Sequence, residues 1–262
     1  MQQLALELAP PPDPTFDSYF PARNAAALAV LREALQASPP RHSFQNPHES
    51  RGPLRGERFI YLWGPRGSGK SHLLRAFIAE AALVNTAAVA QNTHCTGTAM
   101  YFQTGARIDA GDGGDGGDGG MVAAVDDVER LDMVGQLALF DLYNRVRTGS
   151  GTLVSAGTRP PMDLPLREDL RTRLGAGVVV RLEPLTDEEK AAAISEHGRR
   201  RGLALAPELI EYLLTHVTRD MGTQMAVVDT LDRVSLERKR ALTLPLLREV
   251  LRLLGERAGG RR

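Results

Sequence analysis

Eight consecutive residues in the first third of the chain have the types and spacing needed to hold a phosphate chain. They run from Gly64 to Ser71 with the sequence Gly-Pro-Arg-Gly-Ser-Gly-Lys-Ser. Glycines let successive backbone N–H groups turn toward a phosphate, and a following helix adds the positive end of its dipole. Lys70 is placed to reach the outer phosphates, and the Ser71 hydroxyl is placed to hold Mg²⁺. Lysine is scarce in this chain, with three against 29 arginines, yet one stands here.

The motif predicts a bound ADP or ATP with Mg²⁺. The residues expected to contact this nucleotide are Gly64, Gly67, Ser68, Gly69, Lys70, Ser71 and His72. The alternative is a glycine-rich turn that matches by chance. The flanking sequence argues against that alternative, because Phe59–Trp63 predicts a buried strand and the residues from about 71 to 84 predict a helix. A phosphate loop requires this order of elements.

Two carboxylates directly follow a second apolar strand. Asp126 and Asp127 come after Met121–Val125, and in nucleotide-binding α/β sheets the ligand lies beyond the carboxyl ends of the strands. We expect Asp126 to hold Mg²⁺, directly or through water, and Asp127 to orient a water molecule toward the terminal phosphate. The alternative is an acidic loop after a buried strand, but the phosphate loop upstream favours the functional interpretation.

Weaker candidates follow the next two predicted strands. Thr158 comes after Thr152–Ala156, where a polar side chain can sense the terminal phosphate, although a simple turn explains it equally well. Arg171 and Arg173 precede the last strand, Val178–Leu182. Arginines at such positions are ordinarily solvated, so these two carry little weight without a family motif.

The pattern of elements predicts an α/β fold. Strands near 58–63, 99–103, 121–125, 152–156 and 178–182 alternate with helices near 71–84 and 134–148. Such alternation implies a mostly parallel sheet with helices on both faces. We therefore expect a nucleotide-binding α/β domain over residues 15–184, preceded by a flexible tail over residues 1–14.

From Leu185 the strand signals stop, and a small all-helical domain over 185–262 is expected. Thr186 and Glu189 have the spacing of a capping box that opens a helix reaching about Arg201. Further helices are predicted near 206–219, 223–240 and 244–255.

The amino-acid composition excludes only a few classes of function. Hydrophobic residues make up 42% of the chain and the formal net charge is zero, so a large core is expected and no general affinity for nucleic acid. The single Cys95 fits a reducing compartment. No signal peptide or membrane span is evident, so a cytoplasmic location without membrane contact is expected. The Gly-Asp repeat over 111–120 predicts a solvated insertion.

Several strings outside the phosphate loop carry a family resemblance. They are Thr15–Phe20, Tyr61–Trp63, Leu139–Arg145, Arg159–Pro161, Leu185–Lys190, Leu231–Ser235 and Leu242–Pro245. With the phosphate loop they resemble the ATPase module of the bacterial replication initiator DnaA, within the AAA+ class. They resemble more closely the short Hda family, the regulatory inactivators of DnaA. The resemblance covers nearly the whole chain, and the strings at 139–145 and 231–235 are the most specific.

Two features favour the inactivator over the initiator. No segment for a DNA-reading helix-turn-helix domain follows the predicted helical part, so no sequence-specific DNA binding is expected. The N-terminal string also resembles the peptide with which the inactivator binds the DNA-loaded sliding clamp of DNA polymerase III. Its expected clamp-binding residues are Gln3, Leu4, Leu6 and Leu8, although Glu7 departs from the closest pattern.

The resemblance assigns Arg173 the role of an arginine finger supplied in trans. In this family the corresponding arginine reaches ATP bound by a partner subunit, where it neutralises charge that develops on the transferred phosphoryl group. The implied function is negative regulation of replication initiation. With the loaded clamp, this protein would stimulate hydrolysis of DnaA-bound ATP, and Asp127 would serve hydrolysis at its own site. Arg171 is two residues away, so the register stays open.

One departure concerns the lid. The family places a nucleotide-sensing arginine where this chain has Gly222, and Arg219 is one turn away. We therefore expect nucleotide binding with weak intrinsic hydrolysis, and a homodimer is possible. Two alternatives stay open: a self-contained AAA+ ATPase resembling a helicase loader or a truncated initiator, and a clamp-binding adaptor with a vestigial nucleotide site.

Overall fold

The computed structural model describes residues 14–36, 58–90, 99–103, 121–149, 151–217 and 220–259. It divides the chain into two compact units, with the boundary between Pro184 and Leu185. Each unit is described by itself. The proposed clamp-binding residues, Cys95, the Gly-Asp repeat and Arg219 lie outside the described residues.

The first unit is built on a five-stranded sheet in which every pairing is parallel. The strands are β1 (Phe59–Trp63), β2 (Ala99–Phe102), β3 (Met121–Val125), β4 (Gly151–Gly157) and β5 (Val178–Arg181), in the order β2-β3-β4-β1-β5. Because the strands are parallel, their carboxyl ends meet at one edge of the sheet. The segments after β1, β3 and β4 are therefore neighbours.

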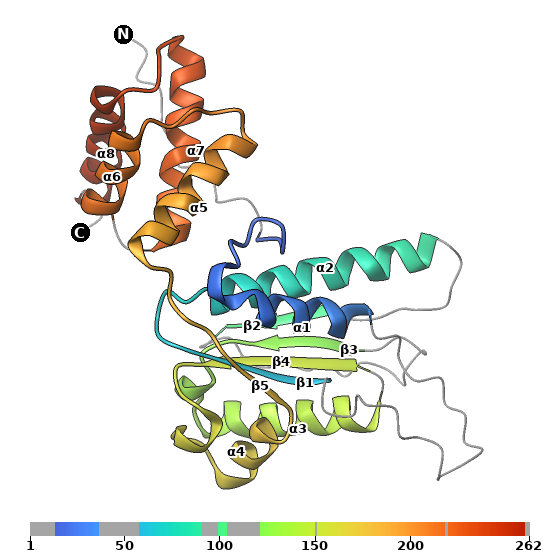
Figure 1. Ribbon diagram of the computed structural model, residues 1–262. Coiled ribbons are helices and arrows are strands. Elements are labelled where there is room, and N and C mark those ends of the chain that lie inside the picture. The colour runs from blue at the N-terminus through green and yellow to red at the C-terminus, as the bar shows by residue number, and fades with distance from the viewer. Residues whose placement is uncertain are drawn as a thin grey trace. The chain divides into compact units, whose positions relative to one another are not determined.

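Helices cover both faces of this sheet, with α1 (Ala25–Gln36) and α2 (Lys70–Ala90) on one face and α3 (Met133–Thr148) and α4 (Glu168–Gly175) on the other (Figure 1). β1 shows why the strands are apolar throughout. Ile60 and Leu62 pack in the core cluster on the α1–α2 side, whereas Tyr61 packs in the cluster on the α3–α4 side. Strands buried on both faces carry continuous apolar runs. α2 continues to Ala90, beyond the predicted end near residue 84.

The second unit contains four helices: α5 (Asp187–Arg200), α6 (Pro207–His216), α7 (Met221–Arg238) and α8 (Leu244–Gly259). Ile194, Leu213, Leu231 and Leu247, one from each helix, are completely buried together. The predicted capping box is confirmed, since Glu189 N–H donates to Thr186 Oγ1 and Thr186 N–H donates to Glu189 Oε2. The predicted α/β fold class with a following all-helical domain is confirmed.

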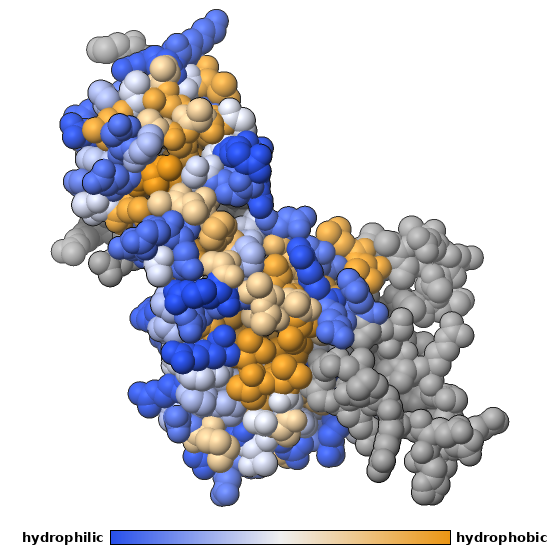
Figure 2. Space-filling view, in the orientation of Figure 1, coloured by the Kyte–Doolittle hydropathy of each residue, from blue (hydrophilic) through white to orange (hydrophobic). Residues whose placement is uncertain are grey.

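The surface of the first unit has an apolar area at the β5 edge (Figure 2), where the side chain of Val179 is 40% exposed. None of the helices in the described ranges combines the length and hydropathy that a bilayer-spanning segment needs.

Candidate nucleotide-binding site

The phosphate loop connects the end of β1 to the start of α2. Gly67 and Gly69 have φ values of +79° and +92°, a left-handed conformation that favours glycine. The first helical hydrogen bond that reaches into the loop is donated by Leu73 N–H to the Gly69 carbonyl, at 3.0 Å. The N–H groups of Lys70, Ser71 and His72 therefore lack acceptors in the described loop and form the donor end of the helix.

Lys70 lies inside this loop. Its side chain is only 6% exposed, and Nζ donates to the carbonyl oxygens of Gly64 at 2.7 Å and Pro65 at 2.9 Å. Burial lowers the pKa of Lys70, and the negative charges of Asp126, Glu129 and Asp127 oppose that shift. The Lys70 amine therefore interacts electrostatically with all three carboxylates.

The loop fits a phosphate chain on two further observations. The Ser68 hydroxyl is buried and has no hydrogen-bond partner among the described residues. A buried polar group without a partner is rare in a native fold, and a bound ligand is one way to satisfy it. With the unpaired N–H groups of the α2 N-terminus, the residues present fit a nucleoside polyphosphate.

Asp126 is held rigidly at the end of β3. Its side chain is 3% exposed, Oδ2 accepts the Tyr101 hydroxyl at 3.0 Å, and Oδ1 accepts the backbone N–H of Asp127 at 3.0 Å. Burial and the neighbouring Asp126 charge raise the pKa of Tyr101 to about 12. Carboxylate oxygens held at the end of a strand beside the phosphate loop are of the type that Mg²⁺ prefers.

Asp127 has an unusual backbone, with φ 48° and ψ 47°. Left-handed geometry is uncommon at residues other than glycine, Asp and Asn adopt it more readily than most, and such strained residues cluster at functional sites. Burial raises the pKa of the Asp127 carboxyl, and the charges of Asp126 and Glu129 raise it further. Arg130 Nη1, at 3.7 Å from Asp127 Oδ2, lowers it in part. A carboxylate with a raised pKa suits the orientation of water or the acceptance of a proton.

Glu129 is a third carboxylate that sequence reasoning missed. One of its oxygens, Oε2, is buried without a hydrogen-bond partner among the described residues. A Cβ built on Gly157 would lie 2.9 Å from this oxygen and clash with the Tyr61 hydroxyl, so only glycine fits at the end of β4. The one signal in the sequence was a carboxylate two residues after Asp127.

Thr158 follows β4, and β4 lies between β3 and β1 in the sheet. Its backbone is therefore placed between Asp126 and the phosphate loop, and its contact with a terminal phosphate stays a prediction.

The side chain of His72 contacts the segment before α1. Its Nε2 lies 3.1 Å from the Thr15 carbonyl oxygen and 3.2 Å from Ser18 Oγ, and its ring lies 5.5 Å from the Tyr19 ring. The imidazole therefore contacts the segment before α1. The backbone N–H of His72 is one of the unpaired N–H groups at the N-terminus of α2. The predicted nucleotide contact of His72 therefore stays a prediction, and the group that could make it is the backbone N–H.

A second contact of that segment was also missed. Asn24 Nδ2 donates to the Glu183 carbonyl at 2.8 Å, and Asn24 Oδ1 accepts the Glu183 N–H at 2.8 Å. Arg23 Nη1 pairs with the Glu183 carboxylate at 2.5 Å. These bonds connect the chain before α1 to the last residues of the first unit.

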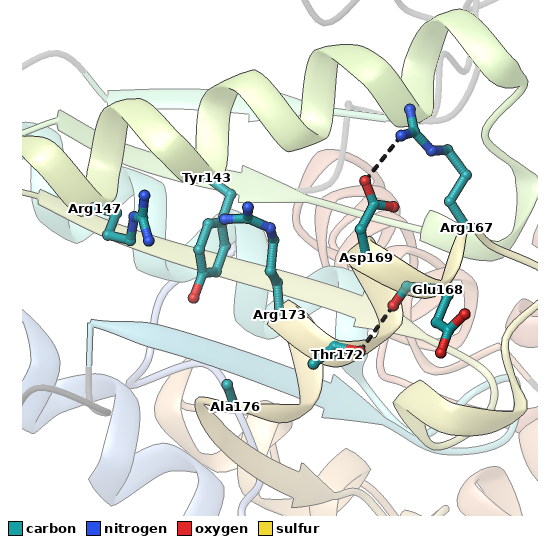
Figure 3. A pocket seen from close by; sticks show the side chains of 8 residues that line it. All are labelled: Tyr143, Arg147, Arg167, Glu168, Asp169, Thr172, Arg173 and Ala176. Atoms are coloured by element: carbon teal, nitrogen blue, oxygen red, sulfur yellow. Dashed lines mark hydrogen bonds and ion pairs between the residues drawn. The ribbon is translucent and has the colours of Figure 1, made fainter.

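The structure does not bring Arg173 to the phosphate loop. Arg173 is in the last turn of α4, and its described partners all belong to α3 (Figure 3). Nη1 donates to Asn144 Oδ1 at 2.9 Å, and the guanidinium lies 4.2 Å from the Phe140 ring centroid and 5.1 Å from that of Tyr143.

Arg171 has a different environment. Its Nη1 donates to the Met162 carbonyl at 3.3 Å, and its Nε is buried without a partner among the described residues. Arg173, by contrast, lines an open pocket between α3 and α4. Of the two candidate arginines, Arg173 is the one presented at the surface of a pocket.

Comparisons with known proteins agree with this geometry. Residues 187–251 match a family model described as the lid domain of Hda. The chain is similar in fold to domain III of the Thermotoga maritima replication initiation protein DnaA, with 19% identity, a TM-score of 0.61, and 92% of this chain and 96% of that chain covered. It is also similar to AMPPCP-bound DnaA from Aquifex aeolicus, with 22% identity, a TM-score of 0.57, and coverage of 87% and 70%. A point mutant of Thermotoga maritima RuvB matches with 16% identity, a TM-score of 0.56, and coverage of 92% and 73%.

The parallel sheet with its phosphate loop is the fold of these neighbours, and the residues of the loop fit a nucleoside polyphosphate. Residues 187–251 resemble the lid domain of Hda, and the chain as a whole has the fold of domain III of DnaA.

Proposed function

We propose that this protein is a negative regulator of bacterial replication initiation that stimulates hydrolysis of ATP bound by a DnaA-type initiator. Arg173 would supply the missing positive charge at the initiator's site. The observation that carries this proposal is the placement of Arg173. It lines an open pocket on the α3–α4 side, and its described contacts are with α3, not with its own phosphate loop. An arginine in that position is available to a neighbouring molecule.

In this proposal the protein's own nucleotide is chiefly a structural ligand. The phosphate loop and Lys70 would hold the phosphates of ADP or ATP. Ser71 and Asp126 would hold Mg²⁺, which neutralises phosphate charge when bound, and Thr158 would contact the terminal phosphate. The donor end of α2, the unpartnered Ser68 hydroxyl and the buried Asp126 support this assignment.

The sliding clamp loaded on DNA is the second proposed partner, bound through Gln3, Leu4, Leu6 and Leu8. These residues have the spacing of a peptide whose glutamine hydrogen-bonds at a pocket rim while leucines fill an apolar groove. The proposal places the protein in the cytoplasm, where the initiator and the clamp meet.

The carboxylates around Lys70 also favour a second candidate, a self-contained ATPase. Asp127 has a raised pKa, and Glu129 adds a third carboxylate near the same amine. This candidate predicts multiple turnover by the isolated protein, whereas the first predicts turnover only in the presence of the initiator.

The test is a single-turnover assay of initiator-bound ATP, with and without clamp-loaded DNA. Wild-type protein is expected to accelerate hydrolysis, and Arg173→Ala is expected to remove about 10³-fold of that acceleration, as for other arginine fingers. Arg199→Ala is the matched control, because Arg199 is an exposed residue of α5 whose partner Glu196 also pairs with Arg200. Acceleration by Arg173→Ala at the wild-type rate would overturn the proposal.

A further inference from the structure

The pocket beside Arg173 is lined by further charged residues that the proposed function does not use. It lies between α3 and α4, has a volume of about 800 Å³, and is lined by three arginines, Arg147, Arg167 and Arg173 (Figure 3). Glu168 and Asp169 contribute the only carboxylates among its lining residues. The distribution of these five charges within the pocket decides what it can bind.

The charges are compensated at one end of the pocket and not at the other. Arg167 Nη2 pairs with Asp169 Oδ2 at 2.9 Å. Arg147 has no ion pair with any carboxylate of the described residues, and Arg173 bonds to a neutral amide, Asn144 Oδ1. Figure 3 shows Arg147 and Arg173 together beside Tyr143, with Asp169 directed toward Arg167.

This end of the pocket is therefore a site of two positive charges. Arg147 extends from the last turn of α3 and Arg173 from the last turn of α4. Tyr143 is 8% exposed and stacks on Phe59 at 4.1 Å, so the aromatic surface between them is fixed. Two guanidinium groups that line one pocket, neither paired with a carboxylate of the described residues, favour an anion that contacts both. Guanidinium groups match the oxygen geometry of phosphate especially well.

We propose that Arg147 and Arg173 form one binding site for the terminal phosphate of a nucleoside triphosphate held by the partner. The inference rests on the proposed function and adds a residue and a division of roles to it. Arg173, oriented by Asn144 and two rings, acts on the reacting phosphoryl group. Arg147, which has no ion pair with a carboxylate of the described residues, adds affinity for the partner when the terminal phosphate is present.

The experiment measures binding of this protein to the initiator in two nucleotide states, one loaded with a non-hydrolysable ATP analogue and one loaded with ADP. Arg147→Ala is expected to weaken binding to the ATP-analogue form about tenfold, the size of one charge-assisted hydrogen bond at a partly solvated site. It is expected to leave binding to the ADP form unchanged. Arg147→Lys should restore part of the loss, because it keeps the charge without the forked geometry.

Hydrolysis gives the second readout. With Arg147→Ala, the concentration for half-maximal stimulation should rise about tenfold while the maximal rate falls by less than about threefold. Arg173→Ala should lower the maximal rate, and Arg199→Ala should change neither quantity.

Three outcomes would overturn the inference. Equal weakening of the ATP and ADP forms would mean that Arg147 contacts a carboxylate on the partner surface. Wild-type behaviour of Arg147→Ala, with Arg173→Ala inactive, would remove Arg147 from the site while the proposed function stands. Absence of stimulation by wild-type protein would reject the proposed function, and the inference with it.

Discussion

Asp127 combines a left-handed backbone with an unfavourable charge environment. It is left-handed at φ 48°, and its carboxyl lies in the negative field of Asp126 and Glu129. Neither feature favours folding. Lys70 partly offsets the negative charge, and its own pKa is lowered by the burial that this position requires. A bound nucleotide with Mg²⁺ would change the charge balance at all four residues together.

The raised pKa of Asp127 gives a prediction about stability. Because the folded state favours the protonated form, ionised Asp127 destabilises the fold at neutral pH, and this cost disappears as pH falls through the folded pKa toward the ordinary value of 3.8. Asp127→Asn, which removes the charge and tolerates left-handed geometry, should raise the urea midpoint at about pH 7.5. The increase should shrink at about pH 4.5, and hydrolysis at the protein's own site should fall.

Asp127→Ala is the matched comparison, because it removes the same charge but adopts φ 48° less easily. Its midpoint should lie below that of Asp127→Asn, by a free energy of about 1 kcal/mol for the left-handed alanine. A midpoint for Asp127→Asn below that of the wild-type protein at neutral pH would contradict the charge argument.

At the scale of elements, the segment before α1 is attached to α2 through one imidazole. His72 projects from the first turn of α2, and its ring contacts Thr15, Ser18 and Tyr19. Tyr19 in turn covers the loop, since a Cβ at Gly69 would lie 2.8 Å from its ring. The segment, the phosphate loop and α2 therefore form one packed unit at the site.

Burial lowers the pKa of His72, so the docked segment favours the neutral ring. Its stabilising contribution is present above the ordinary value of 6.5 and is lost as pH falls through the lower folded pKa. Hydrogen exchange of residues Phe16–Asn24 should accelerate between about pH 7.5 and pH 5, after correction for intrinsic exchange. In His72→Gln this pH dependence should be absent.

The control is His216→Gln in α6, where the histidine stacks on Tyr212 at 3.9 Å in the second unit. Its exchange profile over residues 16–24 should match wild type. An unchanged pH dependence in His72→Gln would show that another group controls the docking.

At the scale of the whole molecule, the two units have separate hydrophobic cores. The first has one core on each face of its sheet, and the second has a core formed by its four helices. All nucleotide-site residues described above belong to the first unit. Gly222, where the family resemblance places a nucleotide-sensing arginine, belongs to the second unit and has no side chain with which to reach a ligand.

We therefore expect calorimetry to resolve two unfolding transitions, only one of which responds to ligand. Mg-ADP at about 100 times its dissociation constant should stabilise the first unit by about 2.7 kcal/mol. The unfolding temperature of the helical unit should not change. Lys70→Ala should abolish the response, because the phosphates lose their buried cation. A nucleotide-dependent rise of both transitions would show that the lid binds the ligand without an arginine at position 222.

The local signals in the chain were reliable because their physics is local. The phosphate loop needs glycines, a lysine and a helix start within eight residues, and the structure has this order, with α2 beginning at Lys70. The capping box depends on two residues three apart, and both of its hydrogen bonds are present. Strand positions followed from apolar runs that both faces of the sheet bury. Element ends were less accurate, as at α2, because they depend on neighbouring segments.

Contacts between distant parts of the chain were not predictable from these patterns. The side chain of His72 follows the phosphate loop directly but serves the segment at Thr15–Tyr19. Asn24 pairs with the backbone of Glu183, 159 residues away. Glu129 belongs to the site because of where its side chain lies relative to β4.

Sequence alone predicted the phosphate loop and determined which segments form strands and helices, because spacing along the chain specifies both. Only the tertiary structure decided that Arg147 and Arg173 line one pocket with Tyr143, because that placement depends on how α3 and α4 pack against one face of the sheet.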